Sequence, residues 1–555
     1  MKNGFLSVLA LAACTGPVLA ADPAEIPPRQ DYGLVTERLS QFIQREMKNK
    51  RLPAISVALV DDQQIVWARG FGYADPGRKI PATARTVYRI GSVSKLFTDI
   101  GIMQLVEKGK INLDAPVAAY ISDFKPDNQF GKPITLRQLM SHRSGLLREP
   151  PVGHYFDPTE PTLKATVLSL NGHPLVYPPE TRVKYSNAGI SVVGYVLEKL
   201  SGRPFAAYLK NAVVKPMGLS SSAFEPEPGI RQNLAKAYMW TYEGRVFQAP
   251  TFQLGMAPAG SMYSTVTDLG RFASVLFAGG RGVLKPETIR EMWTTQFPKA
   301  GGPRSFGIGF VLGQLDGHRT VGHAGAVYGF ATEMKALPDD KLAAIAVTTM
   351  DSANAVTAHI AEEALRLMLA ARAKRALPAI PETQPVPPEM ARRIAGRYGA
   401  TEDKALDLTI REGKLKASWV RGGYEMEVRR LGNDLIMDDR LAWGPKIVPA
   451  KDAITVNGET LRRTAPPNPA PVPKQWQGLV GEYGWDHDIL YILVRDGRLS
   501  CLIEWYEYEP LDPVSHDVFR NPARGLYDKE DFVFQRGPDG RATQVTVGAV
   551  AFKRR

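Results

Sequence analysis

Two serine–lysine pairs in this 555-residue chain have the spacing S-x-x-K: Ser92 with Lys95, and Ser122 with Lys125. Residues three apart share one face of a helix, so the lysine amine can reach the serine hydroxyl there. The apolar pattern of residues 96–106 continues the first pair as a helix. Pro126 follows the second pair directly and pushes Lys125 toward extended backbone, so the second pair is predicted to lie in a loop.

The first pair has the residue types of a nucleophile and its base. A neutral lysine amine can take the proton of a neighbouring serine as the serine oxygen attacks a carbonyl carbon. The partial positive charge of a helix N-terminus disfavours the ammonium form of a lysine placed there. The same spacing also fits a serine that caps a helix beside a solvated lysine. Ser92 and Lys95 therefore need support from other motifs.

Two further motifs supply groups that suit acyl transfer. Tyr185 and Asn187 form the only Y-x-N of the chain, and His323 and Gly325 form its only H-x-G. A tyrosine hydroxyl can pass a proton between nucleophile and leaving group, and an asparagine amide can hold a substrate carbonyl. A histidine supplies positive potential, and a glycine lets a substrate approach the backbone closely.

Together and in this order, the three motifs resemble those of the serine β-lactamase and penicillin-binding-protein superfamily. Five stretches carry the likeness, and they span most of residues 30–370: residues 88–95, 139–146, 185–189, 258–264, and 322–325 with 329–330. The resemblance implies an antiparallel sheet flanked by helices, with an all-helical region. It also implies a serine that is acylated and an acyl-enzyme that is then hydrolysed.

The resemblance assigns roles residue by residue. The catalytic residues would be Ser92 as nucleophile, Lys95 as its base and Tyr185 as the second acid/base. The residues that bind substrate or line the oxyanion hole would be Asn187, His323, Gly325 and Ala326, with the backbone N–H groups of Ser92 and Ala326 as oxyanion donors. No cofactor and no metal is expected.

The third motif separates the branches of this superfamily. Many β-lactamases and wall transpeptidases have K-T-G or K-S-G there, and neither tripeptide occurs in this chain. The H-x-G at His323 resembles the D-aminopeptidase, alkaline D-peptidase and esterase branches. We therefore expect a D-amino-acid peptide or amide as substrate, then an ester, then a β-lactam. A wall-binding or sensor protein without catalysis is the alternative from another class.

Two proline-rich linkers, 378–389 and 466–474, divide the chain, and both are expected to be extended and semi-rigid. The first unit, residues 21–377, has strand-like runs near both ends, for example 54–60 and 330–337, with helical patterns between them. This order predicts an α+β fold in which both ends of the unit build one antiparallel sheet.

The two remaining units, 390–465 and 475–555, look like repeats of one another. Alternating apolar residues flank the pairs Glu412–Gly413 and Asp496–Gly497, which recur 84 residues apart. Such pairs are typical of hairpin turns, so each unit is predicted to be a small all-β, barrel-like domain. D-aminopeptidases of the resembled family also carry two C-terminal β-barrels, one of which sends a loop toward the active site. The tail is therefore expected to modulate substrate choice.

The N-terminus reads as a bacterial export signal. Residues 1–20 combine a basic start, an apolar stretch and a cleavage site that ends at Ala20. The alternative is a lipoprotein, because small residues precede Cys14 as in a lipobox, and lipidation there would attach the chain to a membrane. Either way the protein is expected to be periplasmic or secreted. Only Cys14 and Cys501 are present, so no disulfide is expected within the mature chain.

Charge and composition limit the kinds of binding partner that we expect. Lysine and arginine number 69 against 57 acidic residues, a formal net charge of +12. The basic residues are dispersed and form no long block, which argues against nucleic-acid binding. No apolar stretch past the N-terminus reaches the roughly 20 residues that span a bilayer. The expected partner is a small-molecule or peptide substrate, and the sequence leaves the oligomeric state open.

Overall fold

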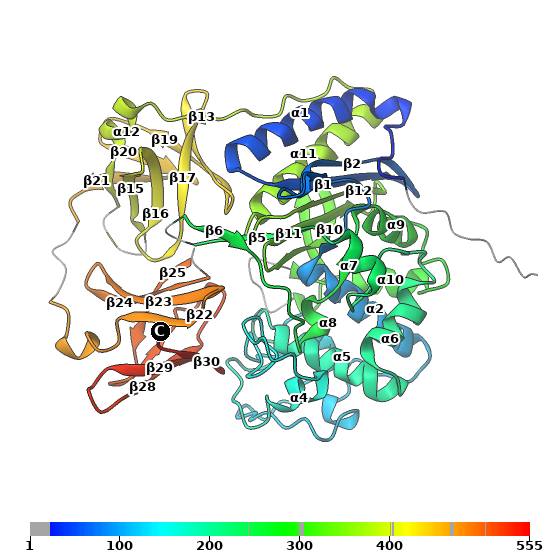
Figure 1. Cartoon of the computed structure of the whole chain (residues 1–555), viewed down its shortest axis with the longest axis horizontal. Coiled ribbons are helices and arrows are strands. Elements are labelled where there is room, and N and C mark those ends of the chain that lie inside the picture. Colours follow the sequence, from blue (N-terminus) through cyan, green and yellow to red (C-terminus); the bar gives the residue numbers. More distant parts are fainter. Residues whose placement is uncertain are drawn as a thin grey trace, which may run out of the picture.

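The computed structural model describes residues 23–241, 244–298, 305–399, 401, 404–466, 471–504 and 507–555. The predicted signal segment and Cys14 lie outside the described residues, and so do residues 467–470 of the second linker. Figure 1 shows a large mixed unit on one side and two β-rich units, one above the other, on the other side.

One eight-stranded antiparallel sheet forms the centre of the large unit. From edge to edge its strands are β3 (Ile80–Pro81), β2 (Gln64–Asp75), β1 (Ala54–Asp61), β12 (Leu342–Thr348), β11 (Phe330–Leu337), β10 (His318–Val327), β9 (Val311–Leu315) and β8 (Ser305–Phe306). The two ends of the unit meet where β1 pairs with β12. This confirms the predicted α+β fold with a sheet built from both ends.

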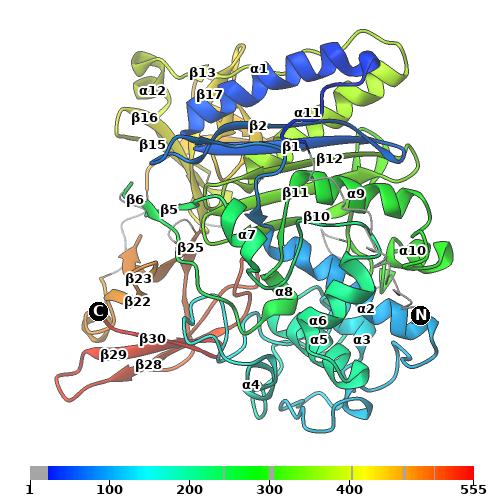
Figure 2. The ribbon, with the colours of Figure 1, turned by 45° about the vertical axis from the view of Figure 1, so that its right-hand side comes forward.

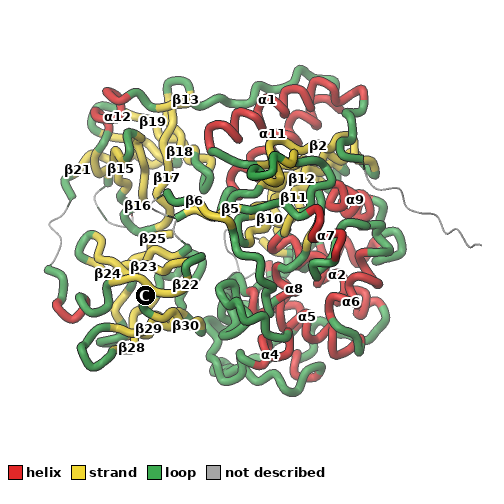
Figure 3. Tube along the Cα trace, in the orientation of Figure 1, coloured by secondary structure: helices red, strands yellow, loops and turns green. Residues whose placement is uncertain are grey.

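Helices cover both faces of this sheet (Figure 2). On one face lie α1 (Gly33–Lys50) and α11 (Asn354–Arg372). The other face and the helical region beyond it are built from α2 (Ser94–Glu107), α3 (Leu136–Met140), α4 (Leu163–Leu168), α5 (Asn187–Ser201), α6 (Phe205–Leu209), α7 (Pro228–Asn233), α8 (Ala257–Gly260), α9 (Val266–Phe277) and α10 (Pro286–Met292). Figure 3 shows these helices gathered away from the β-rich units.

The sequence of β1 explains why both faces must be covered. Ile55, Val57 and Leu59 enter the core under α1 and α11. Ala58 and Val60 enter the core that contains α2 and α9. Side chains of a strand alternate between its faces, and all eight residues of β1 are buried, so this strand needs a helix layer on each side.

The first unit of the tail is a closed eight-stranded barrel. Its strands are β14 (Gly396–Tyr398), β15 (Leu406–Arg411), β16 (Lys414–Trp419), β17 (Gly423–Leu431), β18 (Asp434–Asp438), β19 (Trp443–Pro449), β20 (Ala453–Val456) and β21 (Glu459–Thr464). The pairings of β14 with β21 and of β16 with β17 close the ring. Glu412 and Gly413 form the predicted hairpin turn, with φ angles of 52° and 72°.

The second tail unit, which we call the second barrel unit, is also all-β. It contains β22 (Gly481–Trp485), β23 (Asp488–Arg495), β24 (Arg498–Ile503), β25 (Glu507–Pro510), β26 (Asp512–Pro513), β27 (Val518–Arg520), β28 (Asp531–Arg536), β29 (Ala542–Val547) and β30 (Val550–Lys553). The repeat predicted from the sequence recurs in its contacts. Arg463 donates to the Tyr398 hydroxyl, and Arg554 donates to the Tyr483 hydroxyl, each at 2.8 Å.

Two features of the tail differ from the expected separate domains on extended linkers. Strand β17 pairs with β25, so one continuous sheet runs through both units. The segment 378–389 ends in helix α12 (Pro388–Ile394) instead of staying extended. The reason is local, since proline at the first helical position has the backbone angle a helix needs and lacks only an N–H that would be unpaired there.

The tail packs tightly on the large unit. Phe156 of the large unit is fully buried in the apolar core of the second barrel unit, where its ring stacks on Trp485 at 5.6 Å. Lys50 at the end of α1 forms a buried ion pair of 2.6 Å with Asp438 of β18. His359 of α11 stacks on Trp443 of β19 at 3.9 Å.

Candidate active site

Ser92 lies on a sharp turn directly before α2. Gly91 has a φ of +53°, and a Cβ there would stand only 2.6 Å from the backbone nitrogen of Ala326. Only glycine therefore fits at this position. The Ser94 hydroxyl accepts the Met262 N–H at 3.0 Å, which fastens the turn to the predicted motif of residues 258–264.

Lys95 points back at Ser92 from the first turn of α2. Its side chain is fully buried, and its Nζ lies 3.0 Å from the Ser92 hydroxyl oxygen. Two further oxygens hold it: Oδ1 of Asn187 at 2.9 Å and the carbonyl of Ala259 at 2.7 Å. The oxygens of Asn187 and Ala259 accept two N–H groups of the amine, so its remaining position faces the Ser92 hydroxyl. Ala259 acts through its backbone, which the sequence did not reveal.

Tyr185 lies over this lysine. The Lys95 Nζ is 5.0 Å from the centre of the Tyr185 ring, and the His142 ring packs on Tyr185 with its centre 4.2 Å away. Burial, together with the charges of Lys95 and other cations, holds the pKa of His142 well below its usual range. His142 is therefore neutral, and its Nδ1 accepts the N–H of Ser186 at 3.2 Å. Ser186 caps α5, so the Y-x-N motif is held at a helix start.

The H-x-G motif lies on β10 against the Ser92 turn. A Cβ on Gly325 would stand 1.9 Å from the Ile90 carbonyl oxygen, so this close approach requires glycine. The Asn354 amide donates to the Gly325 carbonyl at 2.9 Å and fixes the strand end. His323 lies 6.3 Å from Tyr185, ring centre to ring centre. The predicted donor at Ala326 thus belongs to a strand packed directly on the turn that carries Ser92.

All seven predicted site residues therefore meet in one place. Six line a cavity of about 730 Å³: Ser92, Tyr185, Asn187, His323, Gly325 and Ala326; Lys95 lies behind Ser92. Ser122 and Lys125 lie in a loop and line no part of this cavity. The catalytic and binding roles assigned to the seven site residues stay predictions. The observed geometry is the one that those roles need.

Sequence reasoning missed a buried ion pair beside Asn187. Glu149 accepts the Asn187 side-chain N–H at 2.7 Å and lies 3.3 Å from the Arg148 guanidinium. Burial raises the pKa of Glu149 to about 7, although Arg148 and Asn187 act in the opposite direction. Glu149 thereby orients the amide whose oxygen holds Lys95. Both residues are in a loop without a pattern, so no sequence signal marked them.

The second barrel unit reaches this site. Its segment 527–530, which includes Tyr527, Asp528 and Glu530, lies against the Y-x-N loop of the large unit. The Arg148 guanidinium lies between two rings, 5.7 Å from Tyr185 and 5.6 Å from Tyr527. Glu530 accepts the Arg148 backbone N–H at 2.8 Å. The tail therefore contacts the candidate active site, a question the sequence left open.

Acidic side chains gather on one wall of the cavity. Asp351 and Glu504 line it, the latter from the end of the second unit's β24 hairpin. Burial raises the pKa of Asp351 to about 7, and the negative charge of Glu504 adds to the effect. Burial and the charges of Glu504 and Asp351 raise the pKa of Asp488 well above its ordinary value. A cation placed here would stabilise all three carboxylates.

Within the described ranges no three histidine, cysteine, aspartate or glutamate side chains are grouped so that they could hold a metal ion. Among the same residues no helix has the length and apolar character needed to cross a membrane.

Comparison with known proteins now decides the family. The model of the family described as Beta-lactamase matches residues 39–367. The chain belongs to the beta-lactamase family. Members of this family are serine hydrolases, and the match covers all seven predicted site residues.

Individual relatives agree with this assignment. The teichoic acid D-alanine hydrolase of Staphylococcus aureus is 29% identical over 42% of this chain and 56% of its own length. The chain spans less than two thirds of the curated relatives that it matches. An octameric penicillin-binding protein homologue from Pyrococcus abyssi has the same fold, with a TM-score of 0.56, 23% identity and coverage of 85% and 99%. A D-amino acid amidase from Ochrobactrum anthropi follows, with a TM-score of 0.50, 23% identity and coverage of 57% and 91%.

Proposed function

We propose that this protein is an exported serine hydrolase that cleaves the amide bond of D-amino-acid amides or peptides with a free amino group. The observation that carries the proposal is the acidic wall formed by Asp351 and Glu504 in the cavity of Ser92. The export part rests on the signal-like residues 1–20, with lipidation at Cys14 as its alternative.

Acylation would use the contacts at Lys95. The neutral amine of Lys95 takes the Ser92 proton across 3.0 Å while the serine oxygen bonds to the substrate carbonyl carbon. The oxyanion that forms receives N–H groups from Ser92 and Ala326. Tyr185 delivers a proton to the leaving nitrogen, and the C–N bond breaks. Water then attacks the ester on Ser92, with the proton transfers reversed, and releases the acid.

The acidic wall would select the amino group. The cationic side chains that also line the cavity already form ion pairs with other carboxylates, for example Arg182 with Asp528 and Lys184 with Glu530. In the part of the chain that the structure describes, no cation lies within ion-pair distance of Asp351. A substrate ammonium held there gains a charge-assisted hydrogen bond, which an acetylated nitrogen cannot form. With an N-blocked substrate the Asp351 carboxylate keeps only its hydrogen bonds from the Gly329 N–H and the Ser352 hydroxyl and gains no cation.

The D-configuration rests on relatives. The H-x-G motif resembles the D-peptidase branches, a 29% identical relative is named for D-alanine hydrolysis, and a neighbour of the same fold is a D-amino acid amidase. These names support the choice of enantiomer, whereas the acidic wall supports the free amine.

The test compares four substrates on the full-length protein: D-alanine p-nitroanilide, its L-enantiomer, its N-acetyl derivative and p-nitrophenyl acetate. We expect the free D-anilide to have the highest kcat/KM of the anilides, by tenfold or more over the acetylated form. Equal rates for the free and acetylated anilides would contradict the amine preference. Hydrolysis of the ester alone would make the protein an esterase.

A further inference from the structure

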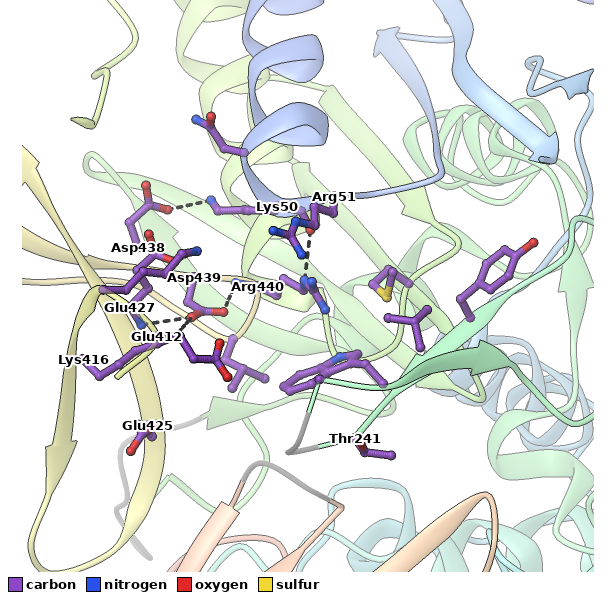
Figure 4. A pocket seen from close by; sticks show the side chains of 18 of the residues that line it. Lys50, Arg51, Thr241, Glu412, Lys416, Glu425, Glu427, Asp438, Asp439 and Arg440 are labelled. Carbon is purple, nitrogen blue, oxygen red and sulfur yellow. Dashed lines mark hydrogen bonds and ion pairs between the residues drawn. The ribbon is translucent and has the colours of Figure 1, made fainter. Parts of the chain in front are cut away.

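A second cavity, of about 740 Å³, lies between the large unit and the first barrel (Figure 4). The end of α1, the hairpin of β5 (Tyr238–Trp240) and β6 (Val246–Gln248), and strands of the barrel line it. It shares no lining residue with the cavity of Ser92. Met350 and Asp351, neighbours in the sequence, face different cavities, so a thin wall separates the two.

The lining of this cavity carries a surplus of positive charge. Seven cationic and five acidic side chains line it. Most of them form ion pairs: Lys50 with Asp438, Arg411 with Glu425, Lys414 with Glu427, Lys416 with Asp439, and Arg429 with Glu427 and Asp438. Among the described residues, Arg51 and Arg440 have no carboxylate within ion-pair distance. Glu412, at a hairpin turn, is the acidic lining residue without such a partner there.

Contacts with the large unit fix Arg440 of the barrel in place. Its Nε donates to the Lys50 carbonyl at 3.0 Å, and its guanidinium lies 5.3 Å from the centre of the Trp240 ring. Figure 4 shows Arg51 beside it at the same end of the cavity. Burial lowers the pKa of Arg440, the nearby charge of Asp439 acts in the opposite direction, and the charge of Arg51 has a smaller lowering effect. The backbone contact uses one of the five N–H donors, so the terminal nitrogens are left to bind an anion in a forked geometry.

We infer that this cavity binds an anionic group, a carboxylate or a phosphate, between the guanidiniums of Arg51 and Arg440. An anion there relieves the repulsion of two cations that the fold holds together. The volume exceeds one such group, so the ligand carries an adjoining part that lies along Tyr238 and Tyr508. The terminal carboxylate of a peptide and the phosphodiester of a polymer both supply this chemistry. The inference does not depend on the proposed hydrolase activity.

Calorimetric titration of the full-length protein tests the site with N-acetyl-D-alanyl-D-alanine, its uncharged amide, the phosphodiester glycerophosphoglycerol and inorganic phosphate. We expect at least one anion to bind, more weakly as salt is added, and the amide to bind at least about tenfold more weakly than the acid. The probe that binds more tightly, peptide or phosphate, shows which of the two ligands supplies the anionic group. Failure of all three anions to bind at low salt would overturn the inference.

Variants assign the binding to this cavity. Arg51→Asn removes one charge from an exposed side chain, and asparagine tolerates the φ of 53° there, so the fold is kept. We expect it and Arg440→Met each to weaken the anion about tenfold or more. Glu412→Gln should strengthen it, because the cavity loses a negative charge. Arg541→Met, at an exposed arginine of the second barrel unit, is the matched control. Equal affinity in Arg51→Asn, Arg440→Met and Arg541→Met would overturn the inference.

Discussion

Glu530 of the second barrel unit and Lys184 of the large unit form a buried ion pair of 2.7 Å next to Tyr185. The same carboxylate accepts the N–H of Arg148, and the Arg148 carbonyl accepts the N–H of Asn187 at 2.8 Å. The tail thereby fixes the backbone on both sides of the Y-x-N motif. We conclude that Glu530 is a positioning residue of the candidate active site.

Substitution of Glu530 tests this role. Glu530→Ala leaves the Lys184 ammonium buried without a partner, which should lower the free energy of unfolding by about 3–5 kcal/mol. It should also lower kcat/KM at least tenfold, because Asn187 loses its support. Glu530→Gln keeps an acceptor for the Arg148 N–H and should retain more activity than the alanine variant.

The control for Glu530 is its neighbour Asp531. Asp531 pairs with Arg520 at the surface, with side chains 36% and 41% exposed. Asp531→Ala should therefore change stability by no more than about 1 kcal/mol. Denaturant unfolding and steady-state kinetics of both alanine variants give the comparison. Equal effects of the two substitutions on stability and kcat/KM would show that Glu530 does not position the active site.

Lys95→Arg should be almost as damaging as Lys95→Ala. Arginine keeps the positive charge but cannot lose its proton at accessible pH, so it cannot serve as a base. Loss of a general base lowers the rate by about 10²–10⁴-fold. Steady-state kinetics on an activated ester would measure both variants. An arginine variant with most of the wild-type rate would show that Lys95 acts only through its charge.

Phe156→Ala should destabilise the whole chain, although Phe156 lies in a loop of the large unit. Its ring is fully buried in the core of the second barrel unit, and such a truncation costs about 3–5 kcal/mol. Phe130→Ala, at a phenylalanine that is 40% exposed, is the control and should have a small effect. Urea unfolding followed by intrinsic fluorescence measures the unfolding midpoint of both variants. Equal midpoints for both variants would mean that the tail is not docked through Phe156.

The proposed ammonium site predicts a pH dependence. Burial raises the pKa of Asp351 to about 7, so the carboxyl is neutral below this pH and charged above it. Hydrolysis of D-alanine p-nitroanilide should therefore rise in kcat/KM from pH 6 to pH 7.5 more steeply than hydrolysis of the uncharged p-nitrophenyl acetate. Asp351→Asn should make the two profiles parallel. Profiles that are already parallel in the wild type would exclude Asp351 from amine recognition.

Short-range relationships were predictable from the sequence. Ser92 and Lys95 meet because residues three apart share a helix face, and the turn at Asp496–Gly497 follows from residues that accept positive φ. The run of residues 54–60 identified a strand because it is short, is apolar apart from Ser56, and ends at the turn signal Asp61–Asp62. Each of these signals lies within one element.

Long-range relationships were not predictable. Arg148 and Glu149 have no periodic pattern around them, and their importance comes from burial beside Asn187. Glu530 follows a turn in a β-rich unit, and only the docking of that unit brings it to Lys184. An ion pair between domains forms only when the domains pack together. The spacing of residues along the chain does not show which distant side chains then meet. The same holds for the pairing of β17 with β25.

The central claim is that Ser92 becomes acylated. The most direct test incubates the full-length protein with a fluorescent penicillin or a serine-reactive fluorophosphonate and locates the adduct by peptide mass spectrometry. The account predicts one adduct, on the peptide of Ser92, which Ser92→Ala abolishes and Ser122→Ala leaves intact. The 3.0 Å contact of Ser92 with Lys95 motivates this choice, since Ser122 lies in a loop outside the cavity. An adduct that persists in Ser92→Ala, or one found on Ser122, would contradict the assignment of this site.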